Sequence, residues 1–176
     1  TNNNYKNIVI DFDLLFKNKQ HNINTKQKGN LIIQGEKFIL DLDKQKIINN
    51  GEYQWIYIKE MNEVQITNND AESNNINPYN IIKEYKKEYK YEYIGKEEET
   101  NYDIIMLYPI IRNSYLKDIA IIADKSKNKL KKLILSDKSG GTYTYLITYF
   151  KGTNEEVEIF FFNKDLYPGV DIIDLR

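Results

Sequence analysis

Two pairs of aspartates have a residue type and spacing that suit chemistry. Asp11 and Asp13 stand two positions apart, as do Asp41 and Asp43, and in a strand this spacing puts both carboxylates of a pair on one face. Such pairs serve general acid–base catalysis or bind a hard cation. Because apolar residues alternate with these aspartates along the chain, we favour a solvated outer face of a sheet over a catalytic or metal-binding pair.

The other residues with catalytic potential do not make up a site. His21, the only histidine, stands among Asn and Lys in an expected loop, so we expect neither a histidine-based triad nor a multi-histidine metal site. The chain has no cysteine, which excludes thiol catalysis, disulfides and thiolate metal sites. Gly140 and Gly141 are not followed by the lysine of a phosphate-binding loop, so a turn explains them. We therefore expect a protein that is not an enzyme, with no catalytic residue, no metal and no cofactor.

Composition and charge narrow the range of partners. A length of 176 residues predicts a single domain over residues 1–176. The net charge of −1 gives no basis for binding nucleic acid or an anionic membrane. No apolar run approaches the roughly 20 residues of a membrane-spanning helix. The lysines of residues 83–90 are balanced by Glu84 and Glu88, so we interpret this segment as a solvated helix face, with contact to a membrane-bound partner as the alternative.

The elements that would position these residues are mostly strands. Apolar side chains recur at every second position in short runs, which is the pattern of a strand with one buried face. Glycines in the connections, as in Gly51 and Gly140, favour tight antiparallel hairpins. About ten strands are predicted, over residues 6–16, 38–42, 47–48, 53–58, 63–67, 102–108, 117–123, 130–136, 143–150 and 157–162.

One segment has helical spacing instead. Asn77 can cap a helix, Pro78 suits its first turn, and apolar residues follow at steps of three or four positions, namely Ile81, Ile82, Tyr85 and Tyr89. This spacing predicts an amphipathic helix over residues 78–91. Together with the strands it predicts a mostly β fold, an open (incomplete) antiparallel β-barrel with the mid-chain helix as a lid over an apolar cavity.

The chain also resembles a known family along nearly its whole length. The order and spacing of several segments look like the signature of outer-membrane lipoprotein carrier proteins, the LolA-like family, in residues 29–33, 36–38, 50–57, 62–66, 107–109, 119–121, 141–142, 160–162, 167–171 and 174–176. The resemblance implies a chaperone that binds the acyl chains of lipoproteins in an apolar cavity and moves them from the inner to the outer membrane. It implies a periplasmic location, with a signal peptide expected upstream.

The same resemblance implies the partners. These are acylated lipoproteins, an inner-membrane exporter and an outer-membrane acceptor, and we expect a monomer. Members usually begin with an apolar helix that forms part of the lid, whereas here the first predicted strand starts at residue 6, so that helix is absent or precedes this sequence. Members also carry an arginine that helps to hold the lid shut, but Gln34 to Lys37 occupy that place, and we can name no equivalent arginine.

The candidate acyl-binding residues share an apolar side chain on the expected inner face of the early strands or of the helix: Ile10, Phe12, Leu14, Phe38, Leu40, Trp55, Tyr57, Val64, Ile66, Ile81, Ile82, Tyr85 and Tyr89. Alternation tells which residues lie inside and not whether the inside is hollow, so ordinary core packing is the alternative for each of them. Two other functions stay open. A general hydrophobic-ligand or lipid-binding module of the cell envelope would share the fold, and an envelope-structure protein would have a filled interior.

Overall fold

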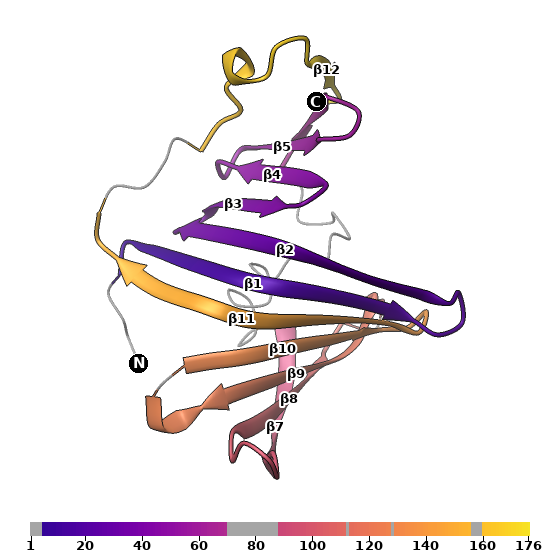
Figure 1. Cartoon of the computed structure of the whole chain (residues 1–176), viewed down its shortest axis with the longest axis vertical. Coiled ribbons are helices and arrows are strands. Elements are labelled where there is room, and N and C mark those ends of the chain that lie inside the picture. The colour runs from indigo at the N-terminus through magenta and orange to yellow at the C-terminus, as the bar shows by residue number, and fades with distance from the viewer. Residues whose placement is uncertain (1–4, 70–87, 112, 128, 156–159) are drawn as a thin grey trace. The chain divides into compact units, whose positions relative to one another are not determined.

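The computed structural model describes residues 5–69, 88–111, 113–127, 129–155 and 160–176. Within these residues, twelve strands form one sheet in the order β12-β6-β5-β4-β3-β2-β1-β11-β10-β9-β8-β7, with β12 and β7 as its end strands (Figure 1). The strands are β1 (Asn7–Asn18), β2 (Ile23–Gln34), β3 (Lys37–Leu42), β4 (Gln45–Asn49), β5 (Tyr53–Ile58), β6 (Glu63–Asn68), β7 (Tyr89–Lys96), β8 (Asp103–Pro109), β9 (Leu116–Asp124), β10 (Lys129–Asp137), β11 (Gly141–Thr153) and β12 (Asp171–Asp174). Two 3-10 turns, η1 (Lys125–Lys127) and η2 (Lys164–Leu166), also lie in the described ranges, and Glu88 is helical directly before β7.

The chain divides into two compact units. Unit 1 contains Thr1–Asp11, Gly29–Ser73 and Lys151–Arg176, and unit 2 contains Phe12–Lys28 and Asn74–Phe150. The long strands β1, β2 and β11 each contribute residues to both units. The single domain expected over residues 1–176 stays a prediction.

Unit 1 is built on an antiparallel meander in which each strand from β2 to β6 pairs with the next (Figure 1). The connection between β4 and β5 is the Asn-Gly turn that the sequence predicts. The side-chain Oδ1 of Asn50 accepts hydrogen bonds from the backbone N–H groups of Glu52 and Tyr53, at 2.9 and 2.8 Å. Gly51 has a φ of 94°, a conformation that a residue with a side chain rarely adopts.

The register gives the sheet of unit 1 two apolar faces, because cross-strand partners share a face and sequence neighbours do not. The face that we call the covered face carries Ile32, Ile39, Ile48, Trp55, Tyr57, Val64 and Ile66. The face that we call the opposite face carries Leu31, Ile33, Phe38, Leu40, Leu42 and Ile47. Unit 1 therefore buries apolar side chains on both sides of one sheet.

Unit 2 is built on the antiparallel strands β7 to β11, paired in sequence order (Figure 1). Its register aligns apolar side chains in two rows, one of Tyr145, Leu133, Ile121 and Ile105 and the other of Tyr143, Leu135, Ile119 and Leu107. The ring of Phe12 contacts that of Tyr145, and the ring of Phe16 stacks on that of Tyr143, with centroid distances of 5.1 and 4.5 Å. These two phenylalanines of β1, with Leu14 between them, extend the same surface, which we call the apolar face of unit 2.

Most of the predicted strands are confirmed. Every strand predicted between residues 6 and 150 is present, with small differences at its ends. The strand predicted at residues 157–162 lies outside the described residues up to 159, and it is wrong for residues 160–162, which are not in a strand. The expectation of a wholly antiparallel sheet is wrong for one pair, because β12 runs parallel to β6. The structure also adds β2, β7 and β12, which the sequence patterns do not predict.

The predicted mid-chain helix over residues 78–91 falls mainly on residues 70–87, which lie outside the described residues. Its predicted end is wrong, because Tyr89 to Tyr91 belong to strand β7. The physical reason is that tyrosines at 85, 89, 91 and 93 fit both a four-residue and a two-residue spacing. Within the described part of the chain, no helix has the length and apolar character needed to cross a bilayer.

Candidate functional site

The structure places the predicted acyl-binding residues of the early strands on two different faces. Phe38 and Leu40 lie on the opposite face of unit 1, whereas the four predicted residues of β5 and β6 lie on the covered face: Trp55, Tyr57, Val64 and Ile66. The expectation of one wall from β1 to β6 is therefore wrong in its geometry. Both faces of this sheet are apolar. Alternation at every second residue therefore identifies a strand, but it does not tell which of its two sets of side chains shares a face with a given set of the next strand.

The side chains of β1 belong with Phe38 and Leu40. Asp11 accepts a hydrogen bond of 2.6 Å from Asn30 Nδ2, and Asn30 is the cross-strand partner of Asp41, the neighbour of Leu40. Asp11 therefore lies on the covered face, and Ile10, its neighbour in β1, lies on the opposite face of unit 1. Phe12 and Leu14 follow Ile10 at every second position and lie on the apolar face of unit 2. The side chains of Ile10, Phe12 and Leu14 are all buried.

The C-terminal segment, residues 160–176, occupies the covered face of unit 1. Phe160 forms a buried cluster with Ile39 and Ile48. Phe162 and Tyr167 stack on each other at 4.6 Å, and their ring centroids lie 5.5 and 4.5 Å from that of Tyr57. The residues of the covered face are thus packed against the protein's own chain.

Polar contacts hold this segment in place. The hydroxyl of Tyr57 donates to Asn62 Oδ1 at 2.9 Å, and Asn62 Nδ2 donates to the carbonyl of Pro168 at 3.2 Å. Beyond Pro168 the chain pairs as β12 with β6. At the last residue, Arg176 forms an ion pair with Asp174 and lies over the ring of Tyr53, 4.7 Å from its centroid.

The apolar face of unit 2 is a second hydrophobic surface, and it carries Phe12 and Leu14 of the predicted site. Leu107, Ile119 and Leu135 are at most 1% exposed, whereas Ile105 and Ile121 are half-buried. All side chains of its two rows are aliphatic or aromatic, so the rows themselves carry no carboxylate and no cation. Its half-buried members, such as Ile105 and Ile121, leave apolar area accessible, and binding of an apolar ligand there would depend on the release of water from that surface.

A hydrogen-bond network around the Asp137 carboxylate lies at one end of this face. Asp137 Oδ1 accepts hydrogen bonds from the N–H and hydroxyl of Ser139, both at 2.8 Å, and from the N–H of Gly141 at 2.7 Å. Asp137 Oδ2 accepts from the hydroxyl of Tyr115 at 2.9 Å. A Cβ at Gly141 would collide with the Asp137 carboxylate and crowd the ring of Phe16, so this position requires glycine.

The network shifts the ionisation of the groups within it. Burial acts to raise the pKa of Asp137, but the hydrogen bonds from Gly141, Ser139 and Tyr115 outweigh it, so the pKa lies below its ordinary value. Burial, together with Tyr115 and Asp137, raises the pKa of Tyr143 to about 12. Sequence reasoning identified only a turn here. The signal that it missed is an aspartate two positions before the serine of a glycine turn, where a short side chain can accept from the turn's amides.

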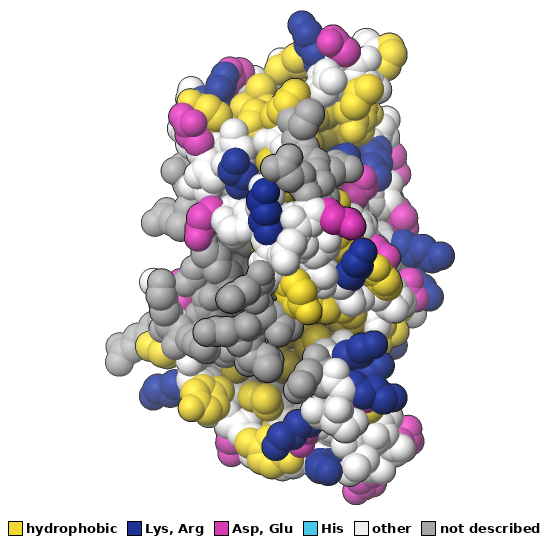
Figure 2. All heavy atoms as spheres, turned by 90° about the vertical axis from the view of Figure 1, so that its left-hand side faces the viewer, with side chains coloured by type: hydrophobic (Ala, Val, Ile, Leu, Met, Phe, Trp, Pro, Cys, Tyr) yellow, Lys and Arg dark blue, Asp and Glu magenta, His cyan; other side chains and the backbone are white. Residues whose placement is uncertain are grey.

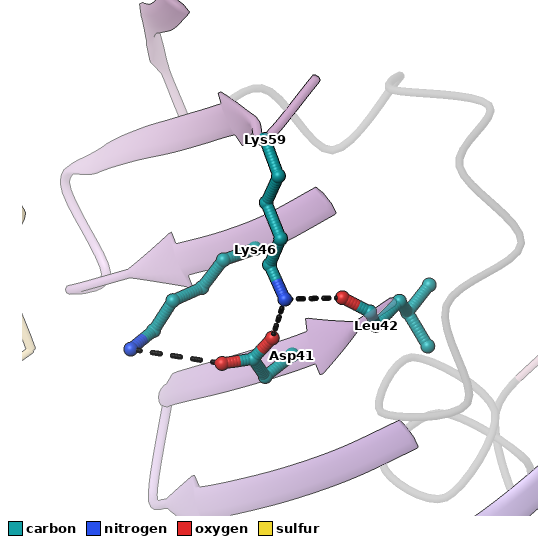
Figure 3. A network of polar contacts seen from close by, with 4 residues as sticks. All are labelled: Asp41, Leu42, Lys46 and Lys59. Atoms are coloured by element: carbon teal, nitrogen blue, oxygen red, sulfur yellow. Dashed lines mark hydrogen bonds and ion pairs between the residues drawn. The ribbon is translucent and has the colours of Figure 1, made fainter. Parts of the chain in front are cut away.

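The two aspartate pairs are engaged in structural contacts. Lys59 Nζ lies 2.6 Å from Asp41 Oδ1 and donates to the carbonyl of Leu42 at 2.6 Å, while Lys46 Nζ lies 3.8 Å from Asp41 Oδ2 (Figure 3). Asp13 forms an ion pair of 3.1 Å with Lys26. The described residues contain no group of three or more His, Asp or Glu side chains placed to hold a metal ion.

Most of the predicted helix residues cannot be placed relative to the site. Ile81, Ile82 and Tyr85 lie outside the described residues, and Tyr89 lies in β7. Elsewhere, hydrophobic side chains reach the surface among lysines and acidic residues (Figure 2). The exposed ones on β7 are Tyr91, Tyr93 and Ile94.

Comparison with known proteins decides the family. Residues 20–139, more than half of the chain, match the family described as outer membrane lipoprotein carrier protein LolA. The chain belongs to the LolA family. No curated protein gives a significant match to it.

Solved structures resemble this LolA-family chain at low sequence identity. It is similar to an uncharacterized conserved protein from Thermus thermophilus, with 8% identity and a TM-score of 0.52 over 93% of this chain and 90% of that chain. It is also similar to a LolA superfamily protein from Nitrosomonas europaea, with 12% identity and a TM-score of 0.49 over 93% of this chain and 92% of that chain. The match over residues 20–139 confirms the resemblance inferred from the sequence at the level of the family.

Proposed function

We propose that this LolA-family chain is a periplasmic carrier that binds the acyl chains of lipoproteins and moves them from the inner to the outer membrane. The observation that carries the proposal is the family match over residues 20–139. That range contains all of strands β8, β9 and β10, which form most of the apolar face of unit 2. The exporter of the inner membrane and the acceptor of the outer membrane are the partners that this role requires.

The physical demand on such a carrier is to keep acyl chains out of water. Each exposed methylene costs about 0.8 kcal/mol, so a free acyl chain would drive aggregation or return to a membrane. Side chains that are only aliphatic or aromatic can take up such a chain without fixed polar contacts, which leaves it free to pass to an acceptor. The apolar face of unit 2 has this composition, with Ile105 and Ile121 half-buried.

The proposed acyl-binding residues are described for each unit by itself. In unit 2 they are Phe12, Leu14 and the half-buried members of its apolar face. In unit 1 they are Ile10, Phe38 and Leu40, which do not lie on its covered face. Trp55, Tyr57, Val64 and Ile66 are left out, because the C-terminal segment packs on their face. The chemistry required is binding alone, so the proposed carrier is not an enzyme.

The experiment compares two neighbouring isoleucines of β8. Ile105 belongs to the apolar face of unit 2, Ile104 points to the other side of the same strand, and both are half-buried. We expect Ile105→Glu to weaken binding of a fluorescent triacylated lipopeptide at least about tenfold, because the carboxylate would be desolvated against the acyl chain. Ile104→Glu, the matched control, should bind within about twofold of the unchanged chain.

Fluorescence anisotropy gives the dissociation constants, and circular dichroism checks that both variants fold. Equal weakening by the two substitutions would contradict the proposed face. Absence of saturable binding by the unchanged chain would contradict the carrier itself.

A further inference from the structure

The end strand β7 has a surface suited to pairing. Within the described residues it hydrogen-bonds to β8 alone. Tyr91, Tyr93 and Ile94 are 77%, 59% and 52% exposed. An end strand presents a row of backbone N–H and C=O groups along its outer edge, which can pair with a strand of another molecule.

The hydrogen bonding to β8 determines which residues face that edge. The N–H of Ile110 donates to the carbonyl of Glu88 at 2.8 Å, so the backbone groups of Glu88 point towards β8. In an antiparallel pair the direction alternates from residue to residue. The backbone groups that point outward are therefore those of three alternate tyrosines, Tyr89, Tyr91 and Tyr93. Pro109, which has no N–H, lies opposite Tyr89, as this alternation requires.

The charges of β7 select a partner and a register. Lys90 and Glu92 flank Tyr91 and are both exposed. If two copies pair antiparallel with Tyr91 opposite Tyr91, each Lys90 lies opposite the Glu92 of the other copy. The nearest registers that keep the outward hydrogen bonds place Lys90 opposite Lys90 or Glu92 opposite Glu92, and like charges directly opposite are destabilising. Of these three registers, only the first is complementary.

The aromatic side chains fit the same register. On the other side of the strand, Tyr91 would lie beside its own copy, and Tyr89 beside Tyr93 of the other copy. Aromatic cross-strand pairs stabilise antiparallel sheets. The hydroxyl of Tyr93 already donates to Asp103 Oδ1 at 2.8 Å, which restricts its side chain before any association.

We propose that two copies of this chain associate through β7, with the strands antiparallel and Tyr91 opposite Tyr91. The sheet then continues from one copy into the other across a two-fold axis. The inference does not depend on the proposed carrier function, and it differs from the monomer expected from the sequence.

A charge swap tests the proposal. Lys90→Glu and Glu92→Lys each turn two attractive pairs into two repulsive ones, so each should weaken dimerisation about tenfold or more. The double variant Lys90→Glu/Glu92→Lys restores opposite charges and should return to within about twofold of the unchanged chain. Sedimentation equilibrium over a range of protein concentrations measures the constants. A chain that stays monomeric throughout, or single variants that dimerise as before, would overturn the proposal.

Cross-linking tests the register. The chain has no cysteine, so Tyr91→Cys introduces a single thiol that the proposed register places about 5.5 Å from its copy between Cα atoms, within reach of a disulfide. Tyr89→Cys is the control, because its partner in this register is Tyr93. Mild oxidation should link the first variant and leave the second unlinked. Equal yields from the two would overturn the register.

Discussion

At the scale of the residue, the Asp137 carboxylate links two connections of unit 2. It accepts hydrogen bonds from the turn that joins β10 to β11 and from Tyr115 in the connection between β8 and β9. Asn18, at the end of β1, donates to the carbonyl of Ser139 at 3.3 Å and so brings a third segment to the same place. The end of the apolar face is therefore fixed by one buried acid and its partners.

This arrangement predicts a dependence of stability on pH. The pKa of Asp137 is lowered in the folded chain, so the carboxylate stabilises the fold above the unfolded pKa of about 3.9, and this contribution is lost as pH falls through the folded pKa. We expect Asp137→Asn to lower the free energy of unfolding by about 1–3 kcal/mol at pH 7 and to flatten its decline below about pH 4. Urea unfolding between pH 3 and 7 measures both effects, and two parallel pH curves would contradict the assignment.

At the scale of the element, the C-terminal segment explains why unit 1 buries both faces of its sheet. A strand buried on both sides carries apolar residues at odd and even positions alike, as Phe38, Ile39 and Leu40 do in β3. Period-two alternation predicts that β3 is a strand but not which neighbour each side chain meets. The parallel pairing of β12 with β6 depends on the return of the chain end, which local patterns do not encode.

Two neighbouring phenylalanines test the role of this segment. Phe160 is 7% exposed and packs against Ile39 and Ile48, whereas Phe161 is 46% exposed. We expect Phe160→Ala to lower the free energy of unfolding by about 3–5 kcal/mol, because it leaves a cavity in the core. Phe161→Ala should change it by no more than about 0.5 kcal/mol. Urea denaturation measures both, and similar losses would show that the segment does not pack as described.

At the scale of the whole molecule, the sequence predicts the mostly β fold and the family, but not which side chains of neighbouring strands share a face. The alternation predicts buried strands at Ile10 to Leu14 and at Phe38 to Leu40, and the structure has buried strands there. β2 is not predicted because its first half, from Ile23 to Lys28, is polar and largely exposed. β7 is not predicted because its tyrosines also fit a helical spacing. The roles of the candidate residues stay predictions, since apolar packing and acyl binding require the same side chains.

The measurement that tests the carrier function most directly is mass spectrometry of the material bound to this protein when it is isolated from a cell-envelope fraction. The Ile105→Glu and Ile104→Glu variants serve as the matched pair. We predict acylated lipoproteins on the unchanged chain and on Ile104→Glu, and their loss from Ile105→Glu. Free lipid without lipoprotein would contradict the carrier and favour a general lipid-binding module, and an empty protein would contradict both.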